Sequence, residues 1–299
     1  MTKDRTLPRK AILILNAKSR SGTAAFERAV QLLEEAGVEL VETHAVKDPK
    51  RMKEAVKAAV RKAPMVIVGG GDGTLSTAID FFKDSKTVFA ILPLGTANSF
   101  ARALGLPLSL GEAVDVIATG VWRSIDLGCI DGDYFGNSAA IGLSPIIART
   151  VPHGLKRALG RVGYLIWAAR VAAGFKPFLL TVDDGRSRSE VWASEVRIAN
   201  GGYFGGIELV EDAELASGEI IVDVVATKTR RNLVASWVSS ALRLRNRDEG
   251  RVEFRGRALR LETDPVMDVT IDGELSTRTP IEVRVAHNAV EVAVPDRKD

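Results

Sequence analysis

The sequence predicts two domains, a parallel α/β domain over residues 1–120 and an antiparallel β-sandwich over residues 121–299. In the first part, apolar runs of strand length alternate with amphipathic stretches of helix length, as in a parallel sheet covered by helices. In the second part, short β-like runs dominate, and turn signals such as Asp131-Gly132 and Asp184-Gly185 separate them. The length of 299 residues also fits two domains.

Strands and helices alternate in the first part. The expected strands are short apolar runs, over Ala11–Leu15, Val38–Ala45, Met65–Val68 and Val88–Leu92. The expected helical stretches carry apolar residues at helical spacing, over Ala24–Ala36, Pro49–Ala63, Thr74–Phe82, Ser99–Leu104 and Glu112–Ala118. Gly37 ends the first helix, and Pro64 ends the second because proline lacks the N–H that a helix needs.

The second part is predicted to be mainly β. Its expected strands are Ser124–Ile130, Phe178–Val182, Val191–Ala199, Ile220–Val225, Ala258–Glu262, Met267–Ile271, Ile281–Ala286 and Ala289–Val294. Two helical stretches interrupt them, Leu155–Ala173 and Arg230–Leu244. The sequence shows no internal repeat or low-complexity linker, so we expect a short boundary near Gly120 and a ligand in the cleft between the domains.

Composition excludes several classes of protein. The chain is 46% hydrophobic and 26% charged, which is ordinary for a globular protein. Cys129 is the only cysteine, so an internal disulfide is excluded and a reducing compartment is favoured. The first apolar run, residues 11–15, is too short for a signal peptide. The best candidate for a membrane span, Tyr164–Phe175, is short and contains Arg170. We therefore expect a cytoplasmic protein.

A glycine-rich turn follows the strand predicted at residues 65–68. It reads Gly69-Gly70-Gly71-Asp72-Gly73-Thr74 and leads into a helix. Without Cβ atoms in the way, its N–H groups can converge on an anion, and the positive end of the helix adds to the attraction. A nucleotide phosphate is the obvious anion, and a Mg²⁺ ion would offset its repulsion by Asp72. Taken alone, the turn also fits a plain tight connection, and no Walker A lysine follows it.

A second glycine turn follows the next predicted strand, at Pro93-Leu94-Gly95-Thr96-Ala97-Asn98. Because neighbouring parallel strands end at the same edge of a sheet, the two turns should line one crevice. The Thr96 hydroxyl would then contact the phosphate or ribose of a nucleotide. The structural alternative is that Thr96 or Asn98 is the N-cap of the following helix.

The glycine turns belong to a longer series of motifs. The others are Ile12 to Ser19, Asp126-Leu127-Gly128, Asn137 with Gly142, Asn200 to Gly206, and Asp272-Gly273-Glu274. Their order and spacing resemble the diacylglycerol kinase catalytic family, which includes bacterial diacylglycerol and phosphatidylglycerol kinases and the sphingosine and ceramide kinases. The resemblance covers nearly the whole chain, and it implies an ATP-binding domain followed by a β-sandwich that takes a lipid acceptor.

The resemblance implies a kinase that uses ATP and Mg²⁺. Its nucleotide-binding positions fall on Asn16, Lys18, Thr43, Gly70, Gly71, Asp72, Gly73, Thr74, Leu75, Ser76 and Thr96. Asp72 would hold the catalytic Mg²⁺. Lys18 would neutralise phosphate charge, although an exposed loop lysine is an equally good interpretation, and Asn16 also fits a simple turn.

Three carboxylates are the candidates for catalysis: Asp272, Glu274 and Asp126. Asp272-Gly273 between two strands is first of all a turn signal. By resemblance, one carboxylate of the Asp-Gly-Glu turn accepts the proton of the lipid hydroxyl, and Asp272 is favoured over Glu274. Asp126 would hold Mg²⁺ or orient the base, or it is only an aspartate at the edge of a strand.

The chain departs from the family pattern at three places. Leu75-Ser76-Thr77 replaces Leu-Asn-Glu after the nucleotide turn, and Leu143-Ser144-Pro145 replaces Phe-Asp-Ala on the acceptor side. The structural Mg²⁺ site of the bacterial members corresponds to Glu214, Ser217 and Glu219. Ser217 stands in place of the ligand aspartate, which puts this site in doubt, although Glu219 could supply a carboxylate.

Basic residues suggest a membrane partner. The net charge is only +3, but nine arginines lie between Arg230 and Arg260. Most of them fit a solvated face, and the functional alternative is a patch for anionic lipid, worth about 1 kcal/mol per basic residue. The candidates are Arg243, Arg245, Arg247, Lys156, Arg157 and Arg161. We expect reversible membrane association and no nucleic-acid partner, since no aromatic-interleaved basic motif is present; a homodimer stays open.

Two other functions remain open at this point. NAD kinases also place a Gly-Gly-Asp-Gly-Thr turn before a sandwich domain, although the turn at residues 93–98 and the later motifs resemble lipid kinases better. A catalytically weak regulator that binds nucleotide or lipid would explain the departures, but Asp72 and Asp272 are both retained. The sequence does not identify the lipid acceptor.

Overall fold

The computed structural model describes residues 6–18, 20–83, 85–152, 163, 166–200, 203–204, 207–208, 215–227 and 250–296. Contacts divide the chain into two compact units. The first contains Met1–Asn137, Asn200–Gly218 and Val285–Asp299, and the second contains Ser138–Ala199 and Glu219–Arg284. Each unit is assembled from separate stretches of chain and therefore has several crossing points. The single domain boundary near residue 120 stays a prediction.

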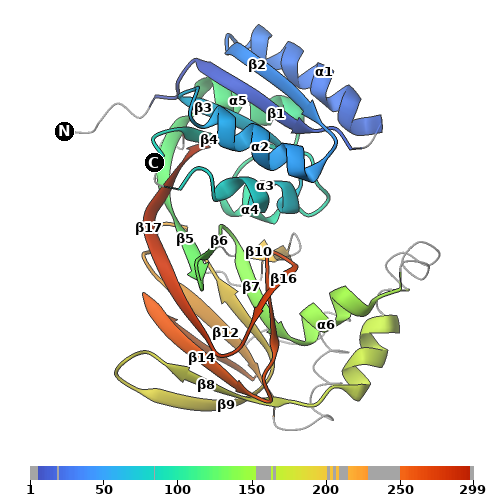
Figure 1. The fold of residues 1–299 in the computed structure, drawn as a ribbon, viewed down its shortest axis with the longest axis vertical. Helices are drawn as coiled ribbons and strands as arrows, with labels where there is room; N and C mark the ends of the chain where they lie inside the picture. Colours follow the sequence, from blue (N-terminus) through green and yellow to red (C-terminus); the bar gives the residue numbers. More distant parts are fainter. Residues whose placement is uncertain are drawn as a thin grey trace. The chain divides into compact units, whose positions relative to one another are not determined.

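The first unit is built on a parallel sheet, as the alternation of strands and helices predicts (Figure 1). Its strands lie in the order β2-β1-β3-β4 and comprise β1 (Lys10–Asn16), β2 (Glu39–Val46), β3 (Met65–Gly70) and β4 (Val88–Pro93). Leu15 lies opposite Gly69 in β3, and Gly69 lies opposite Leu92 in β4. Because the four strands are parallel, their carboxyl ends form one edge of the sheet, and both glycine turns lie there.

A strand from the end of the sequence joins this sheet. The last residues of β17 (Ile281–Val294) run parallel to β4, with Val292 opposite Phe89. The antiparallel strands β5 (Val121–Ile130) and β6 (Asp133–Phe135) follow, and β5 pairs with β17. The prediction of two strands over residues 281–294 is wrong. They form one strand that passes through a left-handed residue, Asn288 (φ 49°).

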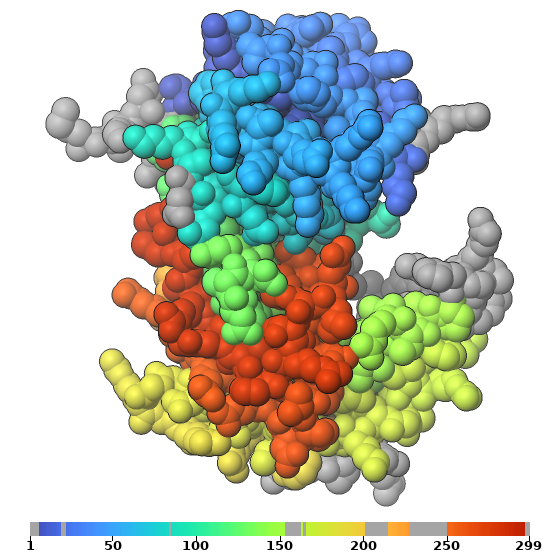
Figure 2. All heavy atoms as spheres, viewed as in Figure 1, coloured from blue at the N-terminus to red at the C-terminus, as the bar shows by residue number. Residues whose placement is uncertain are grey.

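Helices cover both faces of the parallel sheet. α1 (Arg20–Glu35) and α5 (Leu110–Thr119) pack on one face, while α2 (Pro49–Ala59), α3 (Asp72–Ile79) and α4 (Ser99–Ala103) pack on the other. In Figure 2, α2 forms part of the blue surface turned toward the viewer. It begins where the sequence predicts, because Asp48 accepts a hydrogen bond from the Lys50 N–H at 2.9 Å and Pro49 suits the first helical position.

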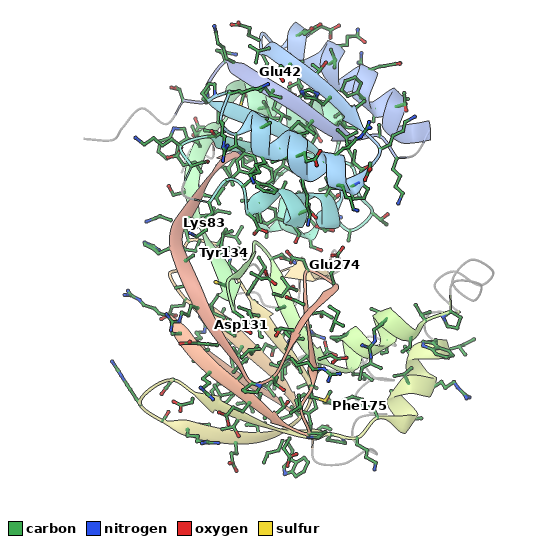
Figure 3. The ribbon with its side chains drawn as sticks, viewed as in Figure 1. Glu42, Lys83, Asp131, Tyr134, Phe175 and Glu274 are labelled. Atoms are coloured by element: carbon green, nitrogen blue, oxygen red, sulfur yellow. The ribbon has the colours of Figure 1, made fainter. Side chains whose placement is uncertain are left out.

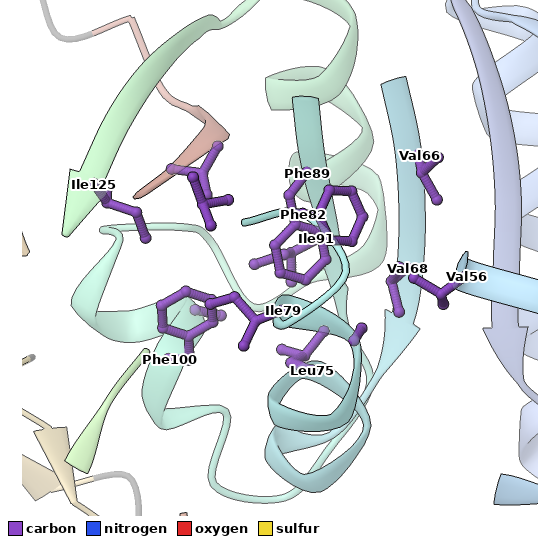
Figure 4. Close-up of a cluster of buried hydrophobic side chains, with 14 of the residues drawn as sticks. Val56, Val66, Val68, Leu75, Ile79, Phe82, Phe89, Ile91, Phe100 and Ile125 are labelled. Carbon is purple, nitrogen blue, oxygen red and sulfur yellow. The ribbon is translucent and has the colours of Figure 1, made fainter. Parts of the chain in front are cut away.

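The core beneath α3 and α4 is rich in large side chains (Figure 4). Phe82 and Phe89 stack with their ring centroids 4.3 Å apart, and the Phe100 ring lies 6.5 Å from that of Phe89. Leu75 and Ile79 of α3 are buried in the same cluster. Since truncating a buried Phe to Ala costs about 3–5 kcal/mol, this cluster holds both helices, and the glycine turns before them, firmly against the sheet.

The second unit is an antiparallel β structure, as predicted. Its strands lie in the order β16-β15-β7-β9-β8-β14-β17, with β12 and β13 attached through β9. They are β7 (Ser138–Gly142), β8 (Phe178–Asp183), β9 (Arg188–Ala199), β12 (Ile220–Ala226), β13 (Arg251–Gly256), β14 (Ala258–Asp264), β15 (Asp268–Ile271) and β16 (Glu274–Arg278). Strands β7, β13 and β16 are not predicted from the sequence, because their small, charged or polar residues give a weak β signal. Helix α6 (Leu143–Thr150) follows β7 directly.

Several predicted features lie outside the described residues. They are the helix at 230–244, most of the helix at 155–173, the basic residues Lys156, Arg157, Arg161, Arg243, Arg245 and Arg247, and the candidate ligand Glu214. Two short strands, β10 (Tyr203–Phe204) and β11 (Ile207–Glu208), pair in the Asn200–Gly218 stretch of the first unit, of which the structure also describes residues 200 and 215–218.

Candidate active site

The two glycine turns touch at Gly71 and Gly95. Gly71 is the N-cap of α3, and Gly95 follows β4. A Cβ atom added to Gly95 would lie 2.5 Å from the Cα atom of Gly71, which is closer than real Cβ contacts allow. The Leu94 N–H also donates to the Gly70 carbonyl at 2.9 Å. The two turns therefore lie together at the edge of the sheet, as predicted, and a side chain at Gly95 would not fit between them.

The first turn is shorter than the sequence predicts. Gly69 and Gly70 belong to β3, where Gly70 lies opposite Pro93 of β4. Helix α3 begins at Asp72 and not at Thr74. The reason is that pairing with β4 continues through Gly70, one residue beyond the last pair with β1. An anion at this edge would thus meet the first N–H groups of α3, which have no partner within the helix.

Asn98 holds the second turn in shape. It occupies the N-cap position of α4 but does not cap that helix with its side chain. Instead its Oδ1 accepts a hydrogen bond from the Gly95 N–H at 2.8 Å, and its Nδ2 donates to the Gly95 carbonyl at 3.0 Å. Asn98 is buried and left-handed (φ 49°). Thr96 is exposed beside it.

Asp72 links the starts of α3 and α4. Its Oδ1 accepts a hydrogen bond from the Phe100 N–H at 3.1 Å. A carboxylate has about four lone-pair positions, so this bond leaves capacity for a cation. Mg²⁺ in phosphate sites commonly takes one or two protein carboxylates together with phosphate oxygens and water. A single carboxylate at this edge of the sheet therefore fits the Mg²⁺ that the sequence implies.

Asn16 and Thr74 join the end of β1 to α3. The Asn16 Nδ2 donates to the Thr74 Oγ1 at 3.0 Å. The Asn16 Oδ1 accepts from the Lys18 N–H at 3.1 Å, which is the turn predicted as the structural alternative for Asn16. These residues lie at the same edge as Gly71, and Lys18 is exposed there.

Some residues predicted to bind nucleotide do not place their side chains at the sheet edge where Asn16, Gly71 and Gly95 lie. Thr43 lies in the middle of β2 opposite Leu13, about 10 Å along the strand from its carboxyl end. Leu75 is completely buried in the core, so only its backbone faces the turn. Gly73 is exposed, and Ser76 is half-buried on α3.

Asp272 forms the turn of the β15–β16 hairpin in the second unit. Asp272 and Gly273 have φ values of 46° and 91°, as a two-residue Asp-Gly turn requires. The Asp272 N–H donates to the Ser138 carbonyl at 3.0 Å, and its Oδ1 accepts from the Ser138 N–H at 3.2 Å. The prediction of a turn is confirmed, and the carboxylate is oriented by the start of β7. Glu274, labelled in Figure 3, is the exposed first residue of β16.

Asp126 lies in β5 and is only 1% exposed. Its Oδ2 accepts from the Gly218 N–H at 2.7 Å, and its Oδ1 accepts from the Asn288 N–H at 2.7 Å. His287 Nδ1 lies 2.8 Å from the same Oδ1. This geometry favours the alternative in which Asp126 is a structural aspartate, and its catalytic role stays a prediction.

The structural Mg²⁺ site predicted from the resemblance does not fit the residues in place. Ser217 offers a neutral hydroxyl where a carboxylate is expected, and Gly218 directs its N–H at Asp126. Glu219 is exposed and immediately precedes β12. Within the part of the chain that the structure describes, no three His, Cys, Asp or Glu side chains are grouped to hold a metal.

Three residues that contribute to these sites are not among the predicted site residues: Asn98, His287 and Asn288. Asn98 belongs to the second glycine turn, and its position three residues after Gly95 is the signal that could have shown its role. His287 and Asn288 gave no signal, because they follow Asp126 by more than 160 residues and belong to no motif.

Comparison with known proteins gives the family. A model of the diacylglycerol kinase catalytic domain matches residues 10–130, and a model of the YegS C-terminal NAD kinase beta sandwich-like domain matches residues 137–294. The chain belongs to the diacylglycerol kinase catalytic family. In this family it is similar to a diacylglycerol kinase of Bacillus subtilis strain 168, with 29% identity over 97% of this chain and 98% of the relative. A YegS-like lipid kinase of Pseudomonas aeruginosa strain UCBPP-PA14 is 30% identical over 96% and 94%.

Solved structures show the same fold. A Bacillus anthracis str. Sterne crystal structure superposes with a TM-score of 0.81, at 23% identity over 99% of this chain and 98% of the other. A second, described as a diacylglycerol kinase of the same strain, gives 0.75 at 20% identity over 96% and 97%. The predicted α/β domain followed by a β-sandwich is thus confirmed. In the described stretches of this family member, no helix has the length and apolar character needed to cross a bilayer.

Proposed function

We propose that this chain is a lipid kinase that transfers the γ-phosphoryl group of ATP to the hydroxyl of a diacylglycerol-like lipid. The observation that carries the proposal is the contact of two glycine turns, Gly71 against Gly95, at the carboxyl edge of a parallel sheet. This arrangement lets a phosphate chain approach the backbone at the start of α3. The names of the two relatives, a diacylglycerol kinase and a lipid kinase, support it.

The proposed roles follow from where the residues lie. The first N–H groups of α3 and the exposed Lys18 bind phosphate oxygens, while Asn16 and Thr74 brace the edge of the sheet. When bound at Asp72, Mg²⁺ supplies charge neutralisation to the phosphates. Asp272 accepts the proton of the lipid hydroxyl as its oxygen bonds to the γ-phosphorus. The bond from that phosphorus to the bridging oxygen breaks, and ADP leaves.

The proposed acceptor lies in a bilayer, so the proposal includes reversible binding to an anionic membrane surface from the cytoplasmic side. Binding of this kind strengthens with the fraction of anionic lipid and weakens with salt, because surface charges are screened within about 8 Å at physiological ionic strength. Co-sedimentation with vesicles of graded anionic content at two salt concentrations measures both dependences.

A transfer assay tests the proposed reaction. The protein is incubated with ATP labelled in the γ-phosphate, Mg²⁺, and in separate reactions mixed diacylglycerol vesicles, a sphingoid base or NAD. We expect label in the extracted diacylglycerol fraction. Label in NAD would identify an NAD kinase. ATP binding without transfer to any acceptor would identify a regulator and reject the proposal.

A further inference from the structure

We infer that Asp126 and His287 form a clasp that joins the three chain stretches of the first unit without a metal ion. The Asp126 clasp consists of Asp126, Gly218, His287 and Asn288. Asp126 comes from the first stretch, Gly218 from the second, and His287 and Asn288 from the third. One buried carboxylate therefore bonds to both of the later stretches.

The backbone of Asp126 adds to the same connection. Its N–H donates to the Leu215 carbonyl at 2.6 Å, and its carbonyl accepts from the Asn200 Nδ2 at 2.8 Å. Asn200 is itself 2% exposed. Side chain and backbone thus hold both ends of the Asn200–Gly218 stretch beside β5. This stretch begins and ends where the chain passes between the two units.

Burying a carboxylate is unfavourable unless hydrogen-bond donors surround it. Asp126 has three such donors, two backbone N–H groups and the His287 ring nitrogen, at 2.7 to 2.8 Å. Asn288 can direct its N–H at Oδ1 because it takes a left-handed conformation in the middle of β17. With about four lone-pair positions on a carboxylate, these donors occupy most of the sites that a cation would use.

The hydrogen-bond donors around Asp126 differ from the oxygen ligands that the family resemblance implies for a structural Mg²⁺ site. The segment that corresponds to the structural Mg²⁺ site carries the Ser217 hydroxyl in place of an aspartate, and Gly218 turns a donor toward Asp126. Oxygen ligands are what Mg²⁺ requires, whereas N–H groups compete with it. The His287 side chain is 62% exposed, whereas the Asp126 side chain that it contacts is 1% exposed. His287 therefore supplies the third donor to the Asp126 carboxylate, where a metal site would need further oxygen ligands.

Thermal unfolding without nucleotide tests the clasp. Wild-type protein is measured in EDTA and in millimolar Mg²⁺, and His287→Ala and His287→Gln are measured in both. We expect no difference in wild-type Tm between the two buffers. His287→Ala should lower Tm by about 3–8 °C, since it leaves a buried carboxyl group short of a hydrogen-bond partner. His287→Gln should recover part of the loss, because an amide can still donate.

His44→Ala is the matched control. His44 is 42% exposed and lies 3.1 Å from Glu42, whose side chain is 37% exposed, so it forms the same type of pair with an accessible carboxylate. Its loss should lower Tm by less than about 2 °C. A saturable rise of wild-type Tm with Mg²⁺ that Asp126→Asn removes would overturn the inference. So would a His287→Ala variant that is no less stable than His44→Ala, a comparison that holds even if Asp126→Asn does not fold.

Discussion

The carboxylate of Asp72 accepts a hydrogen bond from the Phe100 N–H at 3.1 Å, so the first residue of α3 is tied to the second residue of α4. One acidic side chain thus connects the two helices that follow the glycine turns. The same side chain is the proposed Mg²⁺ ligand, so a structural and a catalytic role have to be separated by experiment.

The Asp72→Asn variant separates the structural role of Asp72 from its proposed catalytic role. An asparagine keeps the Oδ1 acceptor for the Phe100 N–H but removes the negative charge, so we expect a near-wild-type Tm. The kcat of phosphoryl transfer should fall by at least about 10²-fold, because the charge on the phosphates is no longer balanced. Both values are measured on the same purified preparation. A folded variant with near-wild-type kcat would show that Asp72 is only a structural link.

Gly95→Ala tests the contact between the turns. The new Cβ would lie 2.5 Å from the Gly71 Cα and 2.8 Å from the Asn98 Oδ1, so the backbone has to move. We expect a loss of about 1–3 kcal/mol in the free energy of unfolding and weaker ATP binding. Denaturant unfolding and ATP titration measure the two effects.

Gly111→Ala is the control for that substitution. Gly111 lies in α5, and a Cβ there would meet no atom within 4 Å. Alanine in a helix should raise stability by about 0.5–1 kcal/mol and leave ATP binding unchanged. If both variants behaved alike, the contact between the turns would not constrain the site.

Asp272→Asn and Glu274→Gln assign the base. Asn-Gly suits the same hairpin turn, and the asparagine side chain would keep an acceptor for the Ser138 N–H, so the fold should be retained. Loss of the general base should lower kcat by roughly 10²–10⁴ with little change in ATP affinity, and Glu274→Gln should cost less. The reverse ranking assigns the base to Glu274. Negligible losses in both variants would mean that the turn is only a hairpin.

Asp80, at the carboxyl end of α3, is expected to make the stability of the fold depend on pH. Burial, with added repulsion from Asp133, raises the pKa of Asp80 from 3.8 to about 6. The native state therefore holds a proton that the unfolded state has released between about pH 4 and pH 6, and stability falls as pH rises through this window. Although its carboxyl group is partly desolvated, Asp80 as a whole is an exposed residue, so solvent limits the effect to less than about 1 kcal/mol.

Asp80→Asn should remove this contribution. The neutral side chain removes the repulsion by Asp133. It also removes the unfavourable interaction of a negative charge with the carboxyl end of a helix. We expect a flatter dependence of Tm on pH from 4 to 7 and a slightly higher Tm at pH 7. Parallel Tm curves for variant and wild type would refute the assignment to Asp80.

Local sequence predicted the two glycine turns at the carboxyl edge of the first unit's sheet well. An apolar run followed by glycines and an amphipathic stretch specifies strand, turn and helix within about 15 residues, and the resemblance gave the order of the motifs. Parallel pairing then brings Gly71 and Gly95 together as a consequence of neighbouring strands. The end of β3 was misplaced because pairing with β4, which no local signal reports, extends the strand through Gly70.

The sequence by itself determined the two fold classes, the family, and the residues at the glycine turns, because these depend on periodicity and on short motifs. Only the tertiary structure decided that residues 281–294 are one strand, that Asp272 is held by Ser138, and that Asp126 is a buried clasp. Asp126 meets Gly218 and Asn288 across 92 and 162 positions of sequence. Such contacts depend on how distant strands pair and on which donors burial brings to a carboxylate, and no local pattern of residues encodes either.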